Sequence, residues 1–342
     1  MRAVMGPLEG IADASRSPRG NQPTINAAGP FCKPISPDKG RVMHKVAIGM
    51  PVWNGEQFVS EAIESILGQT YVDLELVISD NASTDGTAEI CSAYAKQDRR
   101  IRYIRQEKNI GAAPNHHEVF RRSSGQYFKW ACHDDVLAPE FIHECVSALD
   151  ADEAAVVCCP STVLINEDGS PVSYSSQDNG MVDNYGNVWR VGENPRLTSS
   201  DPADRFTAVL CNIDWCFEIY GLIRRSALER VSIMPSYYGG DKVVLAELSF
   251  TGHYHLLEAP LFYRRCHPGQ SSSPQTSRYR AMWISGQRGQ MLPPQLMLTA
   301  AYMRAVLWAK LTPAQRCRCF LAIGRRAATI LVWGSVAPHR RS

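Results

Sequence analysis

Three runs of polar residues, each directly after an apolar run, carry side chains that could do chemistry. Trp53 could pack its ring on a flat base. Asp80 could accept a hydrogen bond from a ring N–H, which uracil, thymine and guanine offer. The adjacent carboxylates of Asp134 and Asp135 suit Mg²⁺ or Mn²⁺ held partly by phosphate oxygens. Each run alone has a commoner use, as a helix cap, a core residue or a solvated turn. The three runs are Pro51–Asn54, Asp80–Asp85 and His133–Asp135.

The elements expected to position these runs alternate between strands and helices. Short apolar runs predict buried strands, and the segments between them have helical spacing of their apolar residues. This alternation predicts an α/β fold with a mostly parallel central sheet and helices on both faces. Ligands of such sheets bind beyond the C-terminal ends of the strands, where the three polar runs lie. The predicted strands are Lys45–Met50, Leu74–Ser79, Ile101–Gln106, Tyr127–Ala131 and Val156–Pro160, and the predicted helices are Phe58–Gly68, Thr87–Lys96, Pro114–Arg122 and Pro139–Asp150.

The pattern loosens after Asn166. Asp168–Pro195 is polar and rich in Gly and Asn, which predicts a long loop or an irregular insertion. Ser271–Ser277 is expected to be a link, and two helices after it predict a C-terminal helical extension. The elements predicted in this half are helices at Asp201–Cys211, Lys242–Phe250, Gln295–Leu311 and Pro313–Trp333, and strands at Ile219–Ile223, His253–Leu257 and Pro260–Arg264.

The composition is that of a globular enzyme rather than a disordered chain. Of the 342 residues, 44% are hydrophobic and 20% charged, which suits one large domain or two modest ones. The eleven cysteines match no zinc-ligand spacing, and free thiols at this density favour a reducing cytosol. The chain contains no run of 18 apolar residues, so no membrane span is predicted. Residues 1–44 have no helical or strand period and are expected to be a disordered leader.

Charge is unevenly distributed, although the net charge is only +2. The 84 residues after Glu258 hold 13 Lys or Arg and no Asp or Glu. In the helix predicted at Pro313–Trp333, Phe320 and Ile323 lie on one face and Arg318 on another, a pattern typical of helices on an anionic bilayer surface. A helix packed on the catalytic domain has the same pattern. We expect a cytoplasmic protein with peripheral membrane contact, and no nucleic-acid partner, because no aromatic-basic motif indicates one.

From Val46 to about Asp168 the chain resembles the nucleotide-binding half of the family 2 inverting glycosyltransferases. Its motifs follow the order and spacing of that family over about a third of the chain. The resemblance implies a GT-A fold, a nucleoside-diphosphate sugar as donor and a divalent cation as cofactor. The motifs are PVWN at 51–54, AIESILGQT at 62–70, LELVISDNASTDGT at 74–87, NIGAAPN at 109–115 and GQYFKWACHDD at 125–135.

The resemblance also implies roles for single residues of the first half. Pro51, Trp53 and Asp80 match positions that hold the base of the donor. Asp134 and Asp135 match the carboxylates that bind metal and ribose, and which of the two contacts the metal stays open.

One position departs from the family pattern. Many family members carry a further acid two residues before Asp134, where this chain has Cys132. Because some members have only the paired acids, Mg²⁺ or Mn²⁺ remains the expected cofactor.

Two segments of the second half resemble the family as well. In YYGGDKVVLAEL at 237–248, Asp241 matches an acid that opens a helix over the acceptor site, and it is the candidate general base, whereas a helix cap is its structural alternative. RRCHPGQSS at 264–272 resembles a loop that closes on the diphosphate. His267 is then a third metal ligand or a phosphate contact, and Arg264 and Arg265 are phosphate contacts. The alternative is a surface loop with solvated arginines.

The expected activity is transfer of a sugar, with inversion, from a UDP or dTDP donor to a glycan or lipid-linked acceptor of the cell envelope. A nucleotide-sugar-binding protein without catalysis is one alternative, which Cys132 favours. A sugar-phosphate nucleotidyltransferase is another, but Pro51–Phe58 lacks the Gly-rich basic loop that it needs. The expected division of the chain is a leader at 1–44, a nucleotide-sugar-binding half at 45–168, an acceptor-binding and catalytic half at 169–270, and a basic helical extension at 271–342.

Overall fold

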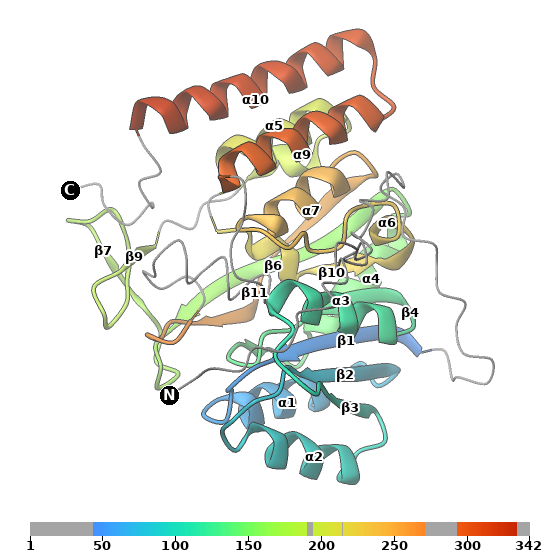
Figure 1. Cartoon of the computed structure of the whole chain (residues 1–342), viewed down its shortest axis with the longest axis vertical. Helices are drawn as coiled ribbons and strands as arrows, with labels where there is room; N and C mark the ends of the chain where they lie inside the picture. Colours follow the sequence, from blue (N-terminus) through green and yellow to red (C-terminus); the bar gives the residue numbers. More distant parts are fainter. Residues whose placement is uncertain (1–43, 190–193, 214, 271–292, 334–342) are drawn as a thin grey trace, which may run out of the picture.

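One sheet of eight strands forms the centre of the protein (Figure 1). The computed structural model describes residues 44–189, 194–213, 215–270 and 293–333. In spatial order the strands are β3 (Ile101–Arg105), β2 (Leu74–Asp80), β1 (His44–Val52), β4 (Gly125–Trp130), β10 (Leu222–Arg224), β6 (Ala155–Ile165), β11 (His253–Arg265) and β5 (Val136–Leu137). Strands β1 to β4 pair in parallel, as do β6 and β11, whereas β10 and β5 are antiparallel to their neighbours. The prediction of a mostly parallel sheet is therefore confirmed.

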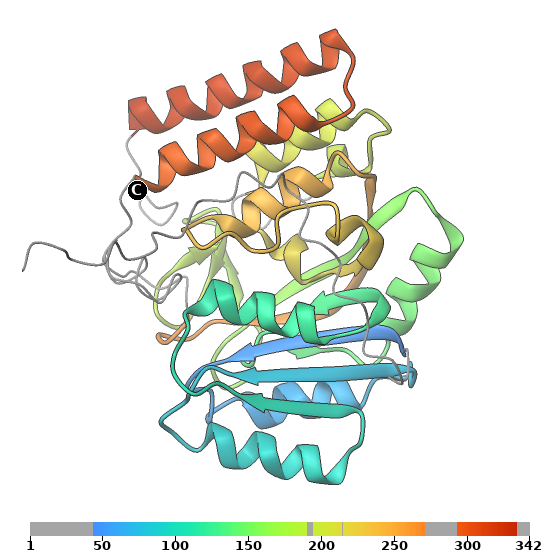
Figure 2. The same ribbon diagram turned by 45° about the vertical axis from the view of Figure 1, so that its right-hand side comes forward.

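Helices cover both faces of this sheet (Figures 1 and 2). Side chains of a strand alternate between the faces, so Val46 and Ile48 of β1 enter one core and Ala47 enters the other. The helices on the first face are α1 (Val59–Leu67), α2 (Thr87–Gln97) and α4 (Phe141–Ala151). Those on the second face are α3 (Ala112–Arg122), α5 (Pro202–Asn212) and α7 (Gly240–Leu248).

Every strand and helix predicted between residues 45 and 160 is present. Most boundaries differ from the prediction by one or two residues, and the last strand continues to Ile165. The short strand β5 was not predicted, because two residues are too few to show a period.

Two predictions for the second half are wrong in detail. The strands predicted at His253–Leu257 and Pro260–Arg264 are one strand, β11, whose register against β6 shifts around Pro260. Proline lacks the N–H that a regular ladder needs, so a bulge at this position is expected. The strand predicted at Ile219–Ile223 is instead the 3₁₀ helix η2 (Phe217–Tyr220) followed by β10.

The insertion predicted as irregular contains a small antiparallel sheet. Its strands are too short for a sequence pattern, and Trp189 anchors them, because its ring is buried and its Nε1 donates to Asp183 Oδ2 at 2.9 Å. The strands are β7 (Ser173–Ser175), β8 (Gly180–Val182) and β9 (Val188–Trp189).

The predicted C-terminal helical extension is confirmed. Helices α9 (Pro294–Trp308) and α10 (Pro313–Trp333) lie against α5 and α7, on the side away from α1 and α2 (Figure 1). Ile323 of α10 is buried in the same core as α5 and α7, and Arg318 forms ion pairs with Asp201 and Asp204 at the start of α5. In the described part of the chain, no helix has the length and apolarity needed to cross a membrane. The predicted leader, apart from His44, and the predicted link at Ser271–Ser277 lie outside the described residues.

Candidate functional site

The loops after β1 and β2 lie together at one edge of the sheet. Val52 of β1 pairs with Asp80 at the end of β2. Beyond these residues, the backbone N–H of Asn54 donates to Ser83 Oγ at 2.9 Å. Asn54 and Ala82 both have left-handed backbone conformations, with φ of 52° and 58°. Residues other than glycine seldom adopt such φ values, and strained positions of this kind are concentrated at functional sites.

The third polar run lies against the first. A Cβ built on Gly55 would approach the ring of His133 to 2.5 Å, so only glycine fits beside this ring. The ring of Phe58, at the start of α1, lies 4.9 Å from that of His267, which follows β11. The loops after β1, β4 and β11 therefore form one continuous region.

Asp80 is fully buried at the end of β2. Its Oδ1 accepts a hydrogen bond from Ser83 N–H at 2.8 Å, and its Oδ2 accepts one from the Tyr103 hydroxyl at 2.8 Å. Burial and the bond to Asp80 raise the pKa of Tyr103, which keeps the hydroxyl a donor. Pro51 and Trp53 are half-buried. A carboxylate oxygen can accept more than one bond, but a base would reach Asp80 only after neighbouring side chains move.

The carboxylates of Asp134 and Asp135, after β4, contact the end of β11. Asp135 Oδ1 accepts hydrogen bonds from Arg264 Nη1 and from the backbone N–H of Arg265, both at 3.0 Å. His267 Nε2 lies 2.9 Å from Asp134 Oδ2. All five residues are buried. The structure thus brings together five of the residues predicted to bind the metal or the donor.

The guanidinium of Arg265 bonds to protein groups. Its Nε donates to the carbonyl of Asp134 at 3.0 Å, and its Nη1 donates to that of Glu167 at 2.9 Å. Its Nη2 pairs with Glu61 of α1 at 2.6 Å, and the group lies 5.0 Å from the ring centre of Phe58. In this conformation Arg265 connects α1 to the loops after β4 and β6, and its predicted contact with phosphate stays a prediction.

The two carboxyl groups have different proton affinities. Burial opposes the ionisation of Asp134, but the neighbouring His133, the hydrogen bond with His267 and the charge of Arg264 outweigh it and hold its pKa below the usual range. Burial dominates for Asp135 and raises its pKa, although Arg264 acts in the opposite direction. Asp134 is therefore the more readily ionised of the two carboxyl groups, and a further positive charge nearby would favour ionisation of Asp135 as well.

A divalent cation fits this pair. Asp135 Oδ2 is buried and has no hydrogen-bond partner among the residues that the structure describes, and such an atom costs free energy unless a ligand engages it. Oxygen atoms of Asp134 and Asp135 and the sulfur of Cys132 all lie within 4.8 Å of one another. Carboxylate oxygens are the preferred protein ligands of Mg²⁺ and Mn²⁺.

Asp241 lies in the first turn of α7, after Gly239, whose φ of +84° allows the turn. Its side chain does not cap the helix; Oδ1 accepts a hydrogen bond from the backbone N–H of Lys242 at 2.8 Å. Burial raises the pKa of Asp241. Among the described residues, no hydrogen bond or ion pair links Asp241 to Asp134 or Asp135.

Two polar groups around Asp241 could not be predicted from the sequence. Glu218 Oε2, in η2, and the hydroxyl of Tyr302, in α9, are buried, and neither has a hydrogen-bond partner in the described ranges of the chain. Burial raises the pKa of both groups, and the charge of Asp241 raises each further. Glu218 and Tyr302 come from elements far apart in the chain, so no spacing in the sequence places them beside α7.

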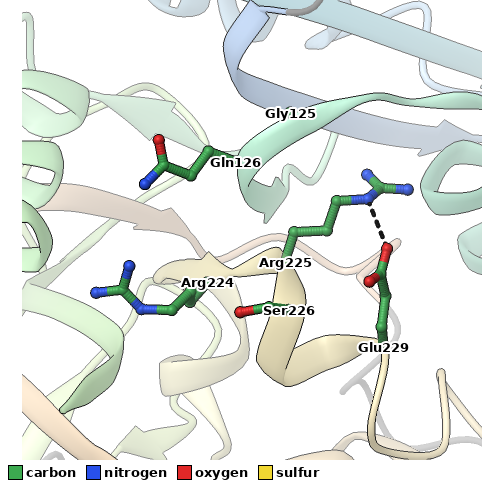
Figure 3. A pocket seen from close by; sticks show the side chains of 6 residues that line it. All are labelled: Gly125, Gln126, Arg224, Arg225, Ser226 and Glu229. Carbon is green, nitrogen blue, oxygen red and sulfur yellow. Dashed lines mark hydrogen bonds and ion pairs between the residues drawn. The ribbon is translucent and has the colours of Figure 1, made fainter. Parts of the chain in front are cut away.

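A small cavity of about 280 Å³ elsewhere in the protein does not belong to this site (Figure 3). Gly125, at the start of β4, and the arginines Arg224 and Arg225 line it. Arg224 donates to the carbonyls of Ala155 and Leu149, and Arg225 pairs with Glu229 at 3.1 Å. Both arginines serve the fold, so the cavity is no evidence for an anion site.

The chain is similar in sequence to known glycosyltransferases. Residues 47–232 match the sequence model of glycosyl transferase family 2. The glycosyltransferase GlyG of Streptococcus pneumoniae serotype 4 is 31% identical over 112 residues, which cover 33% of this chain and 37% of GlyG. A Bacillus subtilis protein whose name proposes a role in teichuronic acid biosynthesis, TuaG, is 33% identical over 90 residues, covering 26% of this chain and 36% of TuaG. The matches thus span little more than a third of these relatives.

The fold is similar to that of S. aureus TarS, which has been solved as residues 1–349 in complex with UDP-GlcNAc and with UDP. The UDP-GlcNAc complex superposes with a TM-score of 0.60 at 14% identity, covering 85% of this chain and 76% of TarS. At such low identity the similarity concerns the fold alone, and it confirms the predicted GT-A architecture.

Proposed function

The chain belongs to glycosyl transferase family 2, and from this premise we propose that it transfers a sugar, with inversion, from a nucleoside diphosphate to a glycan or lipid-linked acceptor. The observation that carries the proposal is the buried pair of Asp134 and Asp135, with one carboxylate oxygen unpartnered, beside the loops after β1 and β2. Most buried polar atoms have a hydrogen-bond partner, so an unpartnered oxygen within a pair of buried acids favours a ligand at this place.

The donor is placed in the loops after β1 and β2. Trp53 and Pro51 flank the base, and Asp80 accepts the hydrogen bond of its ring N–H. The TarS structures with UDP and UDP-GlcNAc support a uridine donor for a protein of this fold, and dTDP offers the same ring N–H.

Asp134, Asp135 and His267 would hold Mg²⁺ or Mn²⁺. When bound, the cation supplies positive charge that stabilises the diphosphate as it leaves. Arg264, 3.0 Å from Asp135, sits where it neutralises the same acids and can turn to an incoming phosphate.

Asp241 acts as the general base. Its carboxylate removes the proton of the acceptor hydroxyl while that oxygen bonds to the anomeric carbon, and the bond from this carbon to the diphosphate breaks on the opposite side. This single displacement inverts the anomeric centre. Its raised pKa supports this role, because a stronger base removes a hydroxyl proton more readily.

The acceptor is assigned to the cell envelope, with support from the name of TuaG. The membrane surface is the place where a lipid-linked acceptor would be met. The sequence predicted membrane contact through the apolar face of α10, but Ile323 of that face is buried in the protein core and Phe320 packs against the same core.

The outer face of α9 is better suited to the membrane. Four large apolar side chains of this helix are exposed, the helix contains no acid, and two cations, Arg304, which also pairs with Glu247, and Lys310, are close to them in the chain. Apolar side chains with flanking cations favour the interface of an anionic bilayer. The four are Leu296, Met303, Leu307 and Trp308.

Sedimentation with phosphatidylglycerol vesicles tests the membrane contact. Leu307→Glu should abolish binding that salt weakens, whereas Val72→Glu, at an exposed apolar residue next to β2, should leave it intact. Equal binding of both variants would remove α9 from the proposal.

Donor hydrolysis tests the activity itself. Purified protein would receive UDP-, dTDP- and GDP-sugars with Mg²⁺ or Mn²⁺, and released nucleoside diphosphate would be quantified beside Asp134→Ala, Asp241→Ala and the exposed control Glu258→Gln. Metal-dependent release that is lost only in Asp134→Ala and Asp241→Ala supports the proposal and names the donor. Nucleotide binding without release, even with lipid acceptors in detergent, would favour a binding protein without catalysis.

A further inference from the structure

We propose that Cys132 is a ligand of the cation held by Asp134 and Asp135, so that the site prefers divalent cations that accept a thiolate. This inference rests on the proposed metal site and adds a residue that sequence comparison treated only as a missing acid. It predicts which cations this chain binds, and it does not depend on turnover.

The first support is distance. The sulfur of Cys132 and one oxygen from each aspartate lie within 4.8 Å of one another. With bonds of about 2.3 Å to sulfur and about 2.0–2.2 Å to oxygen, a sulfur and an oxygen ligand of one tetrahedral zinc ion lie about 3.6 Å apart. Shifts of up to about 1 Å, within the reach of side-chain rotation, would therefore bring the three groups onto one ion.

The second support is the unpartnered oxygen of Asp135. Asp135 is only 4% exposed, and within the described part of the chain its Oδ2 has no hydrogen-bond partner, while Oδ1 is held by Arg264 and Arg265. Asp135, one of the three residues of the cluster, thus keeps one oxygen available for a ligand. The thiol alone would not define a site, but the oxygen indicates a ligand independently.

The thiolate, and not the thiol, is the form of cysteine that binds a cation, so cation binding and loss of the Cys132 proton occur together. On binding, the S–H bond breaks, its proton leaves to solvent and the sulfur forms a bond to the cation.

The chemistry of the ligand set predicts a shift in cation preference. Carboxylates with water and phosphate suit Mg²⁺ and Mn²⁺, whereas a thiolate with imidazole suits Zn²⁺ and Co²⁺. Cys132, Asp134, Asp135 and His267 contain both kinds. Removing the sulfur should therefore weaken Co²⁺ binding far more than Mg²⁺ binding.

Cobalt titration of the purified full chain tests this inference without any substrate. Thiolate bound to Co²⁺ gives a charge-transfer absorption in the near ultraviolet, which carboxylate ligands do not give. The parent protein, Cys132→Ser and the exposed-thiol control Cys211→Ser would be titrated with Co²⁺ and Mg²⁺. We expect the absorption in the parent and in Cys211→Ser, its loss in Cys132→Ser, and a fall in Co²⁺ affinity of about tenfold or more.

Each other result has a defined meaning. Absorption that persists in Cys132→Ser, or that survives Asp134→Ala, would place the thiolate site elsewhere and overturn the inference. Equal loss of Mg²⁺ and Co²⁺ affinity in Cys132→Ser would assign the residue a packing role and overturn it as well. Normal Co²⁺ absorption with no sugar transfer would leave the inference intact and count against the proposed function instead.

Discussion

Replacing Arg265 with methionine tests whether this arginine holds the site together. Methionine keeps most of the aliphatic stem against Phe58 but removes the donors to the carbonyls of Asp134 and Glu167. Hydrogen bonds to a charged group contribute about 1.5–3 kcal/mol each, and the pair with Glu61, which is 55% exposed, adds little. We therefore expect the free energy of unfolding to fall by about 3–6 kcal/mol, and the melting temperature by on the order of 10 °C.

Arg264→Met is the matched variant, because it removes the neighbouring guanidinium from the carboxylates instead. Two buried acids then lack their counter-charge, which should destabilise the protein by about 3–5 kcal/mol. Calorimetry with and without Mn²⁺ separates the two variants. The cation should restore much of the melting temperature of Arg264→Met, since it replaces the lost charge, and little of that of Arg265→Met. If Arg265→Met melts like the parent and binds UDP more weakly, the reasoning is refuted and Arg265 contacts the diphosphate.

Four further predictions concern the second half of the site. Asp241→Asn should lower turnover by about 10²–10⁴-fold with UDP affinity unchanged, as single-turnover assays and titration calorimetry would show. The pKa of Asp241 is raised in the folded protein, so its ionised form destabilises the fold. The protein is most stable below the pKa that Asp241 has in the unfolded chain, and it loses this stability as the pH rises through the pKa of the folded state. Asp241→Asn should therefore also melt at a higher temperature than the parent at neutral pH. The same shift should make kcat/KM fall on acidification at a higher pH than an ordinary aspartate would give, and a profile flat to pH 4 would exclude Asp241 as the base. Glu218→Gln and Tyr302→Phe should leave stability equal or improved, because neither oxygen has a partner, and a raised KM for acceptor alone would identify either as an acceptor contact.

The first half of the site could be predicted because its signals are local. The strand that ends at Asp80 is buried in all seven residues, and the acids follow a strand whose apolar run is equally plain. Parallel strands place their C-terminal ends at one edge, so chain order alone predicts that Pro51–Asn54, Asp80 and Asp134 lie near one another.

The contacts made by the second half depend on tertiary structure instead. Nothing in the spacing of His267 predicts that its Nε2 lies 2.9 Å from Asp134, because β11 must first take its place beside β6. The same holds for the bonds of Arg265 to Glu61 and two carbonyls, which no spacing in the sequence predicts. Its predicted contact with phosphate stays a prediction.

The tail shows a related limit. An amphipathic pattern with arginines fits both a bilayer surface and a protein surface, and the acids that pair with Arg318 lie more than a hundred residues earlier, at Asp201 and Asp204. The exposed apolar side chains of α9 lie in a helix that is apolar on nearly all sides. No periodic pattern in the sequence therefore distinguishes its outer face from the face that is buried against α7.

The position of β11 has a consequence for the order of folding. This strand lies between β6 and β5 and is the last of the described strands to be synthesised, yet its end supplies Arg264 and Arg265 to acids that follow β4. Pairings between distant segments form slowly, and until they form the nascent chain exposes an open edge of β6. The site is therefore completed late in folding. A chain released before residue 265 leaves β6 unpaired at one edge and leaves Asp134 and Asp135 without their arginines. Such a chain would be bound by chaperones or degraded by proteases before it could act as a catalyst.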